Sequence, residues 1–140
     1  SRNQENPSQT PTKMILGPKL LLINKYSASD GDLFPYGFRR HGLGKIIGER
    51  SWGGIVGIRG SLTFVDGTSL NKPEFTSFDA DGNGYIIEGY GVEPDINISN
   101  DPYQEYIGND QQLNKAIEVI KEELKNYKGL PNIPSDPIKN

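Results

Sequence analysis

The sequence predicts an α/β domain, and three observations carry this prediction. Residues 18–24, "PKLLLIN", are an apolar run of strand length that begins at a proline and ends at an asparagine, as in a buried strand. The next segment is predicted to be a helix, because Ser27 or Ser29 can cap it and Asp30 and Asp32 suit the positive end of its dipole. Residues 110–127 carry an apolar stripe at helical spacing, with Glu and Lys on the other face: Leu113, Ala116, Ile117, Ile120 and Leu124.

Short extended segments account for the middle of the chain. Residues 45–49 and 52–58 are each predicted to form a strand. Residues 61–70 predict a hairpin that turns at Asp66-Gly67, and residues 74–92 predict a second one with "DADGNG" at its tip. Residues 93–99 are expected to be extended.

The two ends differ in composition from this domain. Residues 1–15 are polar and contain prolines, and they start at Ser1, so we expect a linker or the cut end of a longer protein. Gly129 and Pro131 are expected to end the last helix, and residues 128–140 to form a loosely ordered tail. Residues 16–127 then hold the domain.

Bulk properties narrow the functional classes. With 140 residues and 34% hydrophobic content, the chain can bury a modest core. A net charge of −3 without a basic stripe favours neither nucleic acid nor a membrane surface as a partner. No apolar run approaches the roughly 18 residues of a membrane span. Because the chain has no cysteine, disulfides and thiolate metal sites are excluded.

Ser29 lies at the predicted strand-to-helix turn, where free backbone N–H groups converge. A serine hydroxyl is a poor nucleophile unless a base takes its proton and donors stabilise the oxyanion. The amide of Asp30, at the first turn of the helix, could supply one such donor. A purely structural interpretation is helix capping, because Ser and Asp are common N-cap residues.

"DADGNG" (79–84) matches the first half of a calcium-binding EF-hand loop. The twelfth position of such a loop should be a bidentate glutamate, but it is Tyr90 here, and Glu88 falls two residues short. The flanks also read as strands. We therefore expect a polar β-turn, and a calcium-binding module is an alternative.

His41 is the sole histidine of the chain and the obvious candidate for a general base. It lies at the far end of the helix that Ser29 begins. Twelve residues at 1.5 Å each place it roughly 18 Å away, so it cannot reach the hydroxyl. We expect it to end the helix, and any base for Ser29 to lie outside this chain.

Residues 17–58, followed by "IEGYGVEPDI" (87–96) and "NDPYQEYIGNDQQLNKAI" (100–117), resemble the catalytic region of the tail-specific (C-terminal processing) serine peptidases, and within them the tricorn type. The resemblance covers about residues 16–122, with the motifs in the family's order. It implies a ClpP/crotonase-like domain of short stacked strands with flanking helices, without metal or cofactor.

The same resemblance implies roles for individual residues. Ser29 matches the nucleophile, and Asp30 the residue whose amide helps form the oxyanion hole. Many family members use a lysine base in a motif at which this chain has "WGGI", with Gly54 at the lysine position. The chain therefore fits the tricorn type, in which a histidine is the base and a glutamate, here Glu88, supports it.

The resemblance also implies partners. An extended peptide substrate would pair with one segment of the chain: Gly54, Ile55, Val56, Gly57 and Ile58. The histidine, a serine that orients it and a second oxyanion-hole glycine would come from upstream parts of the protein. This chain alone is then expected to have negligible activity. A homo-oligomer is compatible with the family.

Alternatives from other classes stay open. A peptide-docking module of the same fold would be indifferent to loss of Ser29. A crotonase-like enzyme acting on acyl-CoA would share the helix-terminus oxyanion hole, but nothing in the sequence indicates a nucleotide pocket.

Overall fold

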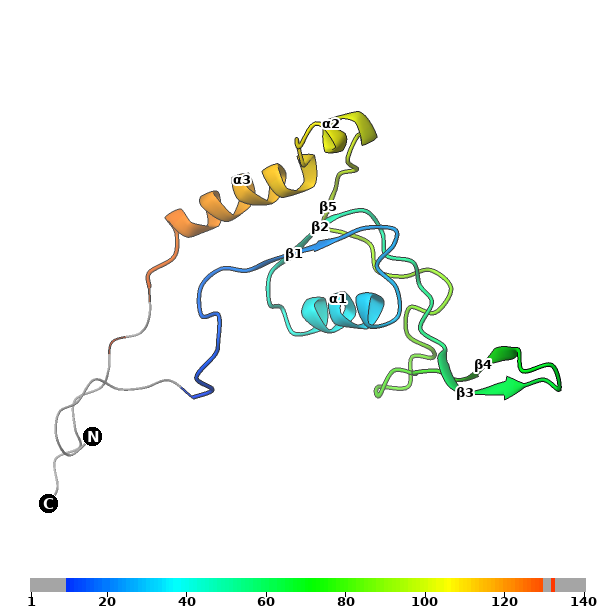
Figure 1. Ribbon diagram of the computed structural model, residues 1–140. Coiled ribbons are helices and arrows are strands. Elements are labelled where there is room, and N and C mark those ends of the chain that lie inside the picture. Colours follow the sequence, from blue (N-terminus) through cyan, green and yellow to red (C-terminus); the bar gives the residue numbers. More distant parts are fainter. Residues whose placement is uncertain (1–9, 130–131, 133–140) are drawn as a thin grey trace, which may run out of the picture.

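The computed structural model describes residues 10–129 and 132. The helices and strands follow one another along this part of the chain as β1 (Leu20–Ile23), α1 (Asp30–Arg40), β2 (Lys45–Gly48), β3 (Gly57–Thr63), β4 (Ser69–Phe75), β5 (Ile96–Asn97), α2 (Pro102–Tyr106) and α3 (Gln111–Lys125). The mixture of a parallel sheet with flanking helices is the predicted α/β class (Figure 1).

A parallel sheet with strand order β1-β2-β5 is the centre of the domain. Leu20 of β1 pairs with Lys45 of β2, and Ile47 of β2 pairs with Ile96 of β5. Ile46 and Ile47 on the middle strand are 0% exposed. Figure 1 shows α1 and α3 on opposite sides of this sheet, which explains why β2 is apolar on both faces.

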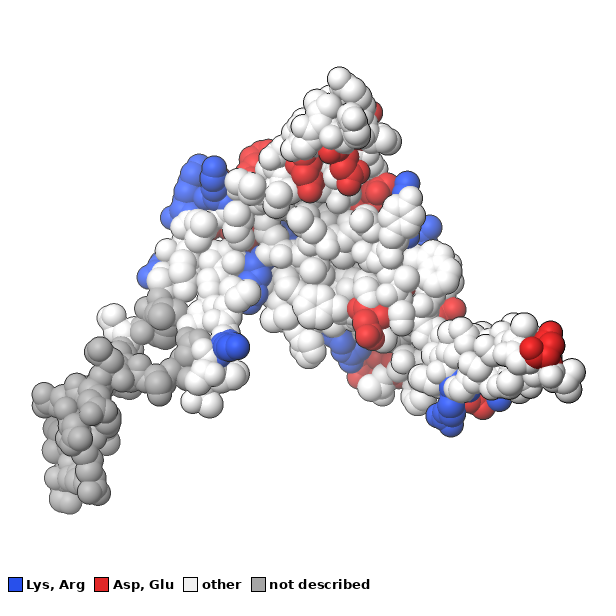
Figure 2. Space-filling model, viewed as in Figure 1, with Lys and Arg blue, Asp and Glu red and all other residues white. Residues whose placement is uncertain are grey.

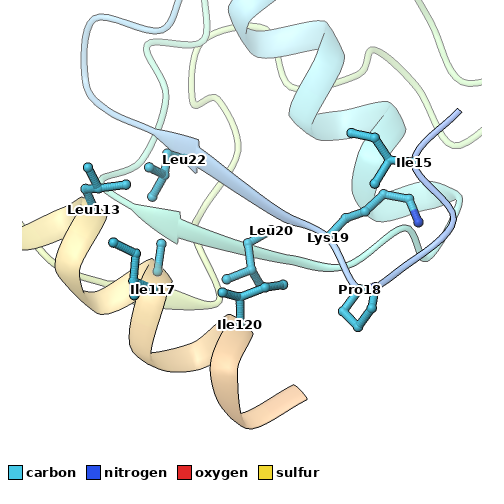
Figure 3. A pocket seen from close by; sticks show the side chains of 9 residues that line it. Ile15, Pro18, Lys19, Leu20, Leu22, Leu113, Ile117 and Ile120 are labelled. Atoms are coloured by element: carbon cyan, nitrogen blue, oxygen red, sulfur yellow. The ribbon is translucent and has the colours of Figure 1, made fainter. Parts of the chain in front are cut away.

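Alternate residues of β1 face the two helices. Ile23 packs in the core with Phe38 of α1, and Leu21 packs against the same cluster. Leu20 and Leu22 lie on the α3 side, where a groove of about 370 Å³ separates β1 from α3 (Figure 3). The predicted stripe of α3 supplies the other wall of this groove: Leu113, Ala116, Ile117 and Ile120. The expected helix over residues 110–127 is thus confirmed as α3, with Asp110 as its N-cap.

β3 and β4 form an antiparallel hairpin that extends away from the sheet (Figure 1). Its turn includes Asp66 and Gly67, as predicted, but the strands extend further, to Gly57 and Phe75. The large apolar side chains of the hairpin are about half exposed or more: Ile58, Leu62, Phe64, Val65, Leu70 and Phe75.

Two strand predictions were wrong. Residues 52–56 are not in a sheet, because the amides of Gly53, Gly54 and Ile55 bond to side-chain carboxylates and not to a neighbouring strand. The expected hairpin over 74–92 is reduced to one bridge between Phe78 and Tyr85. Conversely, α2 was missed, although Asp101 followed by Pro102 is a helix-start signal.

The predicted linker and tail lie at the two ends of the chain and fall largely outside the described residues. Residues 1–9 of the 1–15 linker, and 130–131 and 133–140 of the tail, including Pro131, lie outside the described residues. On the face in Figure 2, acidic and basic side chains lie in separate small groups. Among the helices of residues 10–129, none has the length and apolar character that crossing a bilayer requires.

Candidate active site

Ser29 is the N-cap of α1 and has an unusual backbone conformation, with φ 57° and ψ −112°. Few non-glycine residues adopt such angles, and they persist only where the surroundings enforce them. Here the Ser29 amide donates to the Gly54 carbonyl at 3.2 Å and to the Asp32 carboxylate at 3.0 Å. A serine in a strained turn between strand and helix is one way in which α/β folds expose a nucleophile.

The amide of Asp30 is the next donor along the chain. Within the described residues it has no hydrogen-bond acceptor, whereas the amides of Gly31 and Asp32 bond to Ala28 and Ser29. It lies at the positive end of the α1 dipole, directly after Ser29. This is the position at which a donor can stabilise an oxyanion formed at Ser29.

Glu88 lies beside this turn, although it is 59 residues away in sequence. Its Oε2 accepts a hydrogen bond of 2.7 Å from the Ile55 amide. The neighbouring Gly89 amide donates to the Gly53 carbonyl at 2.7 Å, so the 86–91 turn is joined to residues 53–55 at two points. Glu88 and Ser29 thereby face the same cleft.

This cleft has a volume of about 500 Å³. Its walls come from the serine turn, residues 52–57, the hairpin and the 86–91 turn: Ser29, Trp52, Gly54, Val56, Gly57, Ile58, Pro73 and Glu88. Four of the five residues expected to bind substrate thus line it. Ile55 does not, because its side chain is buried in the hydrophobic core.

Asp32 is a component of the site that the sequence reasoning missed, having given it only a role toward the helix dipole. Its side chain is 0% exposed, and it accepts hydrogen bonds from Gly53 at 2.7 Å, Gly54 at 3.1 Å and Ser29 at 3.0 Å. Its place three residues after the N-cap suits a reciprocal bond to the Ser29 amide. No sequence signal marks the two glycine bonds.

His41 lies where it was expected, as the C-cap of α1. The helix between it and Ser29 spans 11 residues, about 17 Å, so the imidazole is remote from the cleft. The structure therefore does not bring the histidine of this chain to the serine.

The "DADGNG" segment is a turn whose carboxylates are already engaged, as the β-turn interpretation required. Arg40 forms ion pairs with Asp79 at 3.0 Å and Asp81 at 2.8 Å. The amide of Asp81 and the side chain of Asn83 also donate to Asp79. These contacts, led by the Asp81 amide, lower the pKa of Asp79 to about 2. Residues 10–129 contain no group of three or more potential metal ligands.

Serine hydrolase sites combine a strained serine at a helix N-terminus, an adjacent free amide donor and a carboxylate across a cleft; here Ser29, the Asp30 amide, which has no acceptor among the described residues, and Glu88 are so arranged. Residues 1–98 match the family described as Peptidase family S41, and the chain belongs to this family.

Relatives and solved structures agree with this assignment. The chain is 43% identical over 129 residues to the tricorn protease of Thermoplasma acidophilum. This match covers 91% of this chain and 12% of that protein. It is 40% identical to a tricorn protease homolog of Saccharolobus solfataricus, over 85% of this chain and 11% of the other.

The crystal structure of the tricorn protease matches with a TM-score of 0.76 at 41% identity, over 87% of this chain and 12% of that one. Mature CPAF complexed with lactacystin matches with a TM-score of 0.65 at 24% identity, over 79% and 21%, and shows the shared fold alone. The chain spans about an eighth of the length of its tricorn relatives.

Proposed function

We propose that the protein containing this chain is a serine peptidase that cleaves peptides through an acyl-enzyme on Ser29. The observation that carries the proposal is the strained Ser29 at the cleft, directly followed by an amide with no acceptor among the described residues. Membership of a peptidase family and the likeness to tricorn proteases support it.

In this mechanism, Ser29 Oγ attacks the carbonyl carbon of the scissile peptide bond while a base takes its proton. The Asp30 amide donates to the oxygen that becomes negative, and the positive end of α1 favours the same charge. The intermediate collapses as the amine leaves with that proton. Water then hydrolyses the ester and regenerates Ser29.

The base is proposed to be a histidine outside this chain, as in tricorn-type enzymes. His41 is about 18 Å from Ser29 along α1 and cannot serve as the base. Glu88 would orient the histidine that another part of the protein supplies. Its Oε2 is occupied by the Ile55 amide, and its Oε1 has no donor among the described residues. The 140-residue chain by itself is accordingly expected to have negligible activity.

The backbone around Val56 is proposed to bind the substrate by strand pairing. The amides of Gly54 and Ile55 are taken by Asp32 and Glu88. The N–H and C=O of Val56, in contrast, have no hydrogen-bond partner among the described residues. Both groups of a single residue point to the same edge of an extended segment, so Val56 can pair with one residue of an extended peptide.

Covalent labelling tests this proposal. The full-length protein containing this chain, and the 140-residue chain alone, are treated with a fluorophosphonate, and the modified residue is mapped by mass spectrometry. We expect labelling of Ser29 in the full-length protein and not in the short chain. Peptide hydrolysis should be abolished by Ser29→Ala and unaffected by Ser69→Ala, a control at the exposed start of β4.

Glu88→Gln probes the supporting carboxylate. The glutamine can still accept the bond from Ile55 but cannot offer a negative charge to a histidine. We expect hydrolysis to fall by about 10²–10⁴-fold. Full hydrolysis by Ser29→Ala, or strong activity of the short chain alone, would refute the proposed mechanism. Tight peptide binding without labelling would instead indicate a docking module.

A further inference from the structure

Asp32 is the one fully buried carboxylate of the described chain, and the mechanism above gives it no task. A buried carboxylate is costly unless donors satisfy it. Three donors do so here, and all are backbone amides that line the candidate active site or adjoin it. The side chain therefore joins two segments that are separated by more than 20 residues.

The two carboxylate oxygens of Asp32 accept hydrogen bonds from different amides. Oδ1 accepts from the Gly53 amide at 2.7 Å, and Oδ2 accepts from the amides of Gly54 and Ser29 at 3.1 and 3.0 Å. One oxygen thus touches both the nucleophilic residue and the segment that leads to Val56. A change in this carboxylate would shift both segments.

Helix capping alone does not explain this arrangement. A capping box requires only the reciprocal bond to the amide of the N-cap residue, here Ser29. The bonds to Gly53 and Gly54 add nothing to the helix. They fix the 53–56 segment against a serine whose positive φ must be held in place by its surroundings.

We propose that Asp32 is a positioning residue that sets the distance between the Ser29 hydroxyl and the substrate-pairing backbone at Val56. The proposal rests on the proposed function, because it presumes that Ser29 attacks a peptide held on this segment. Reacting groups must be aligned closely, and a displacement of 1 Å can reduce a rate by about 100-fold.

Asp32→Asn in the full-length protein is the first test. Asparagine keeps the size of aspartate but has one acceptor oxygen. Whichever way the amide is turned, its NH2 group faces the N–H of Gly53, or those of Gly54 and Ser29, and the pair must separate. We expect kcat to fall by about 100-fold. Glu105→Gln, which removes an exposed carboxylate on α2, is the matched control and should keep the normal rate.

A second readout separates positioning from folding. A folding defect lowers the fraction of molecules that react, and therefore the amplitude of fluorophosphonate labelling, while those that react do so at the normal rate. Loss of positioning lowers the rate constant and leaves the amplitude. A reduced rate constant at full amplitude supports the proposal, and a reduced amplitude at the normal rate constant overturns it.

Hydrogen exchange in the unmodified protein covers the case in which the variant does not fold. The amides of Ser29, Gly53 and Gly54 should exchange slowly and with similar protection factors, because one carboxylate holds all three. Rapid exchange at Gly53 with slow exchange at Ser29 would overturn the proposal.

The Ser29→Ala variant distinguishes failure of the proposed function from failure of the positioning role. If Ser29→Ala stays active, the proposed function fails. If Ser29→Ala is inactive while Asp32→Asn keeps kcat within twofold, only the positioning role fails.

Discussion

Replacing Gly53 with alanine would add a methyl group where two loops of the site meet. Gly53 has φ +85°, and a Cβ there would lie 2.4 Å from the Gly91 nitrogen and 2.7 Å from the Tyr90 nitrogen. Ordinary contact begins at 3.4 Å, so the gap has to open by about 1 Å. Both neighbours are backbone atoms, and they cannot turn aside as a flexible side chain can.

Two terms set the expected cost of Gly53→Ala. A left-handed conformation costs a residue with a Cβ about 1–2 kcal/mol. Forcing extra volume into a packed site adds about 1–3 kcal/mol. The free energy of unfolding should therefore fall by about 2–5 kcal/mol.

Gly82→Ala is the matched control for this change. Gly82 has nearly the same φ, +82°, but a Cβ there meets no atom within 4 Å. Gly82→Ala should therefore lower the free energy of unfolding only by the cost of the left-handed backbone conformation, about 1–2 kcal/mol. Urea unfolding followed by circular dichroism gives both values, with the slope m checked for constancy. If the two variants differ by less than roughly 0.5 kcal/mol, the close approach at Gly53 is not a source of strain, and our reasoning is refuted.

Two further predictions concern the core and the acid response. Ile47→Ala, at a side chain that is 0% exposed, should lower the free energy of unfolding by about 2–5 kcal/mol, whereas Ile107→Ala, at a side chain that is 54% exposed, should change it by less than about 0.5 kcal/mol in the same urea experiment. The pKa of Asp79 is lowered from 3.8 to about 2, so its contribution to stability is complete above about pH 5 and is lost as the pH falls through about 2. The difference in Tm between the unmodified protein and Asp79→Asn should therefore shrink over this range, and a constant difference would contradict the assignment.

The elements with strong local patterns were predictable from the sequence. The apolar run that became β1, the serine-capped α1 and the striped α3 each carry their signal within a few adjacent residues. The Asp66-Gly67 turn is equally local. The order of strand and helix placed the serines at the turn into α1, and the family resemblance singled out Ser29 among them.

The rest depended on contacts between distant residues. Residues 52–56 have the composition of a strand, but the carboxylates of Asp32 and Glu88 take the amides that a strand ladder would use. No periodicity in the sequence encodes such a pairing. For the same reason Asp32 looked like a helix-end charge, while its main contacts lie more than 20 residues away.

The two walls of the cleft differ in rigidity, because one of them belongs to the β3–β4 hairpin. Ser29 on one wall begins α1, which packs on the sheet through Phe38, whereas Ile58 and Pro73 on the other wall belong to a two-stranded ribbon. An isolated hairpin is only marginally stable in water, so this ribbon is expected to open and close in local fluctuations without unfolding the sheet. The entropy lost when one wall stiffens around a bound chain would then reduce the affinity of that chain, while the rigid wall keeps the nucleophile aligned.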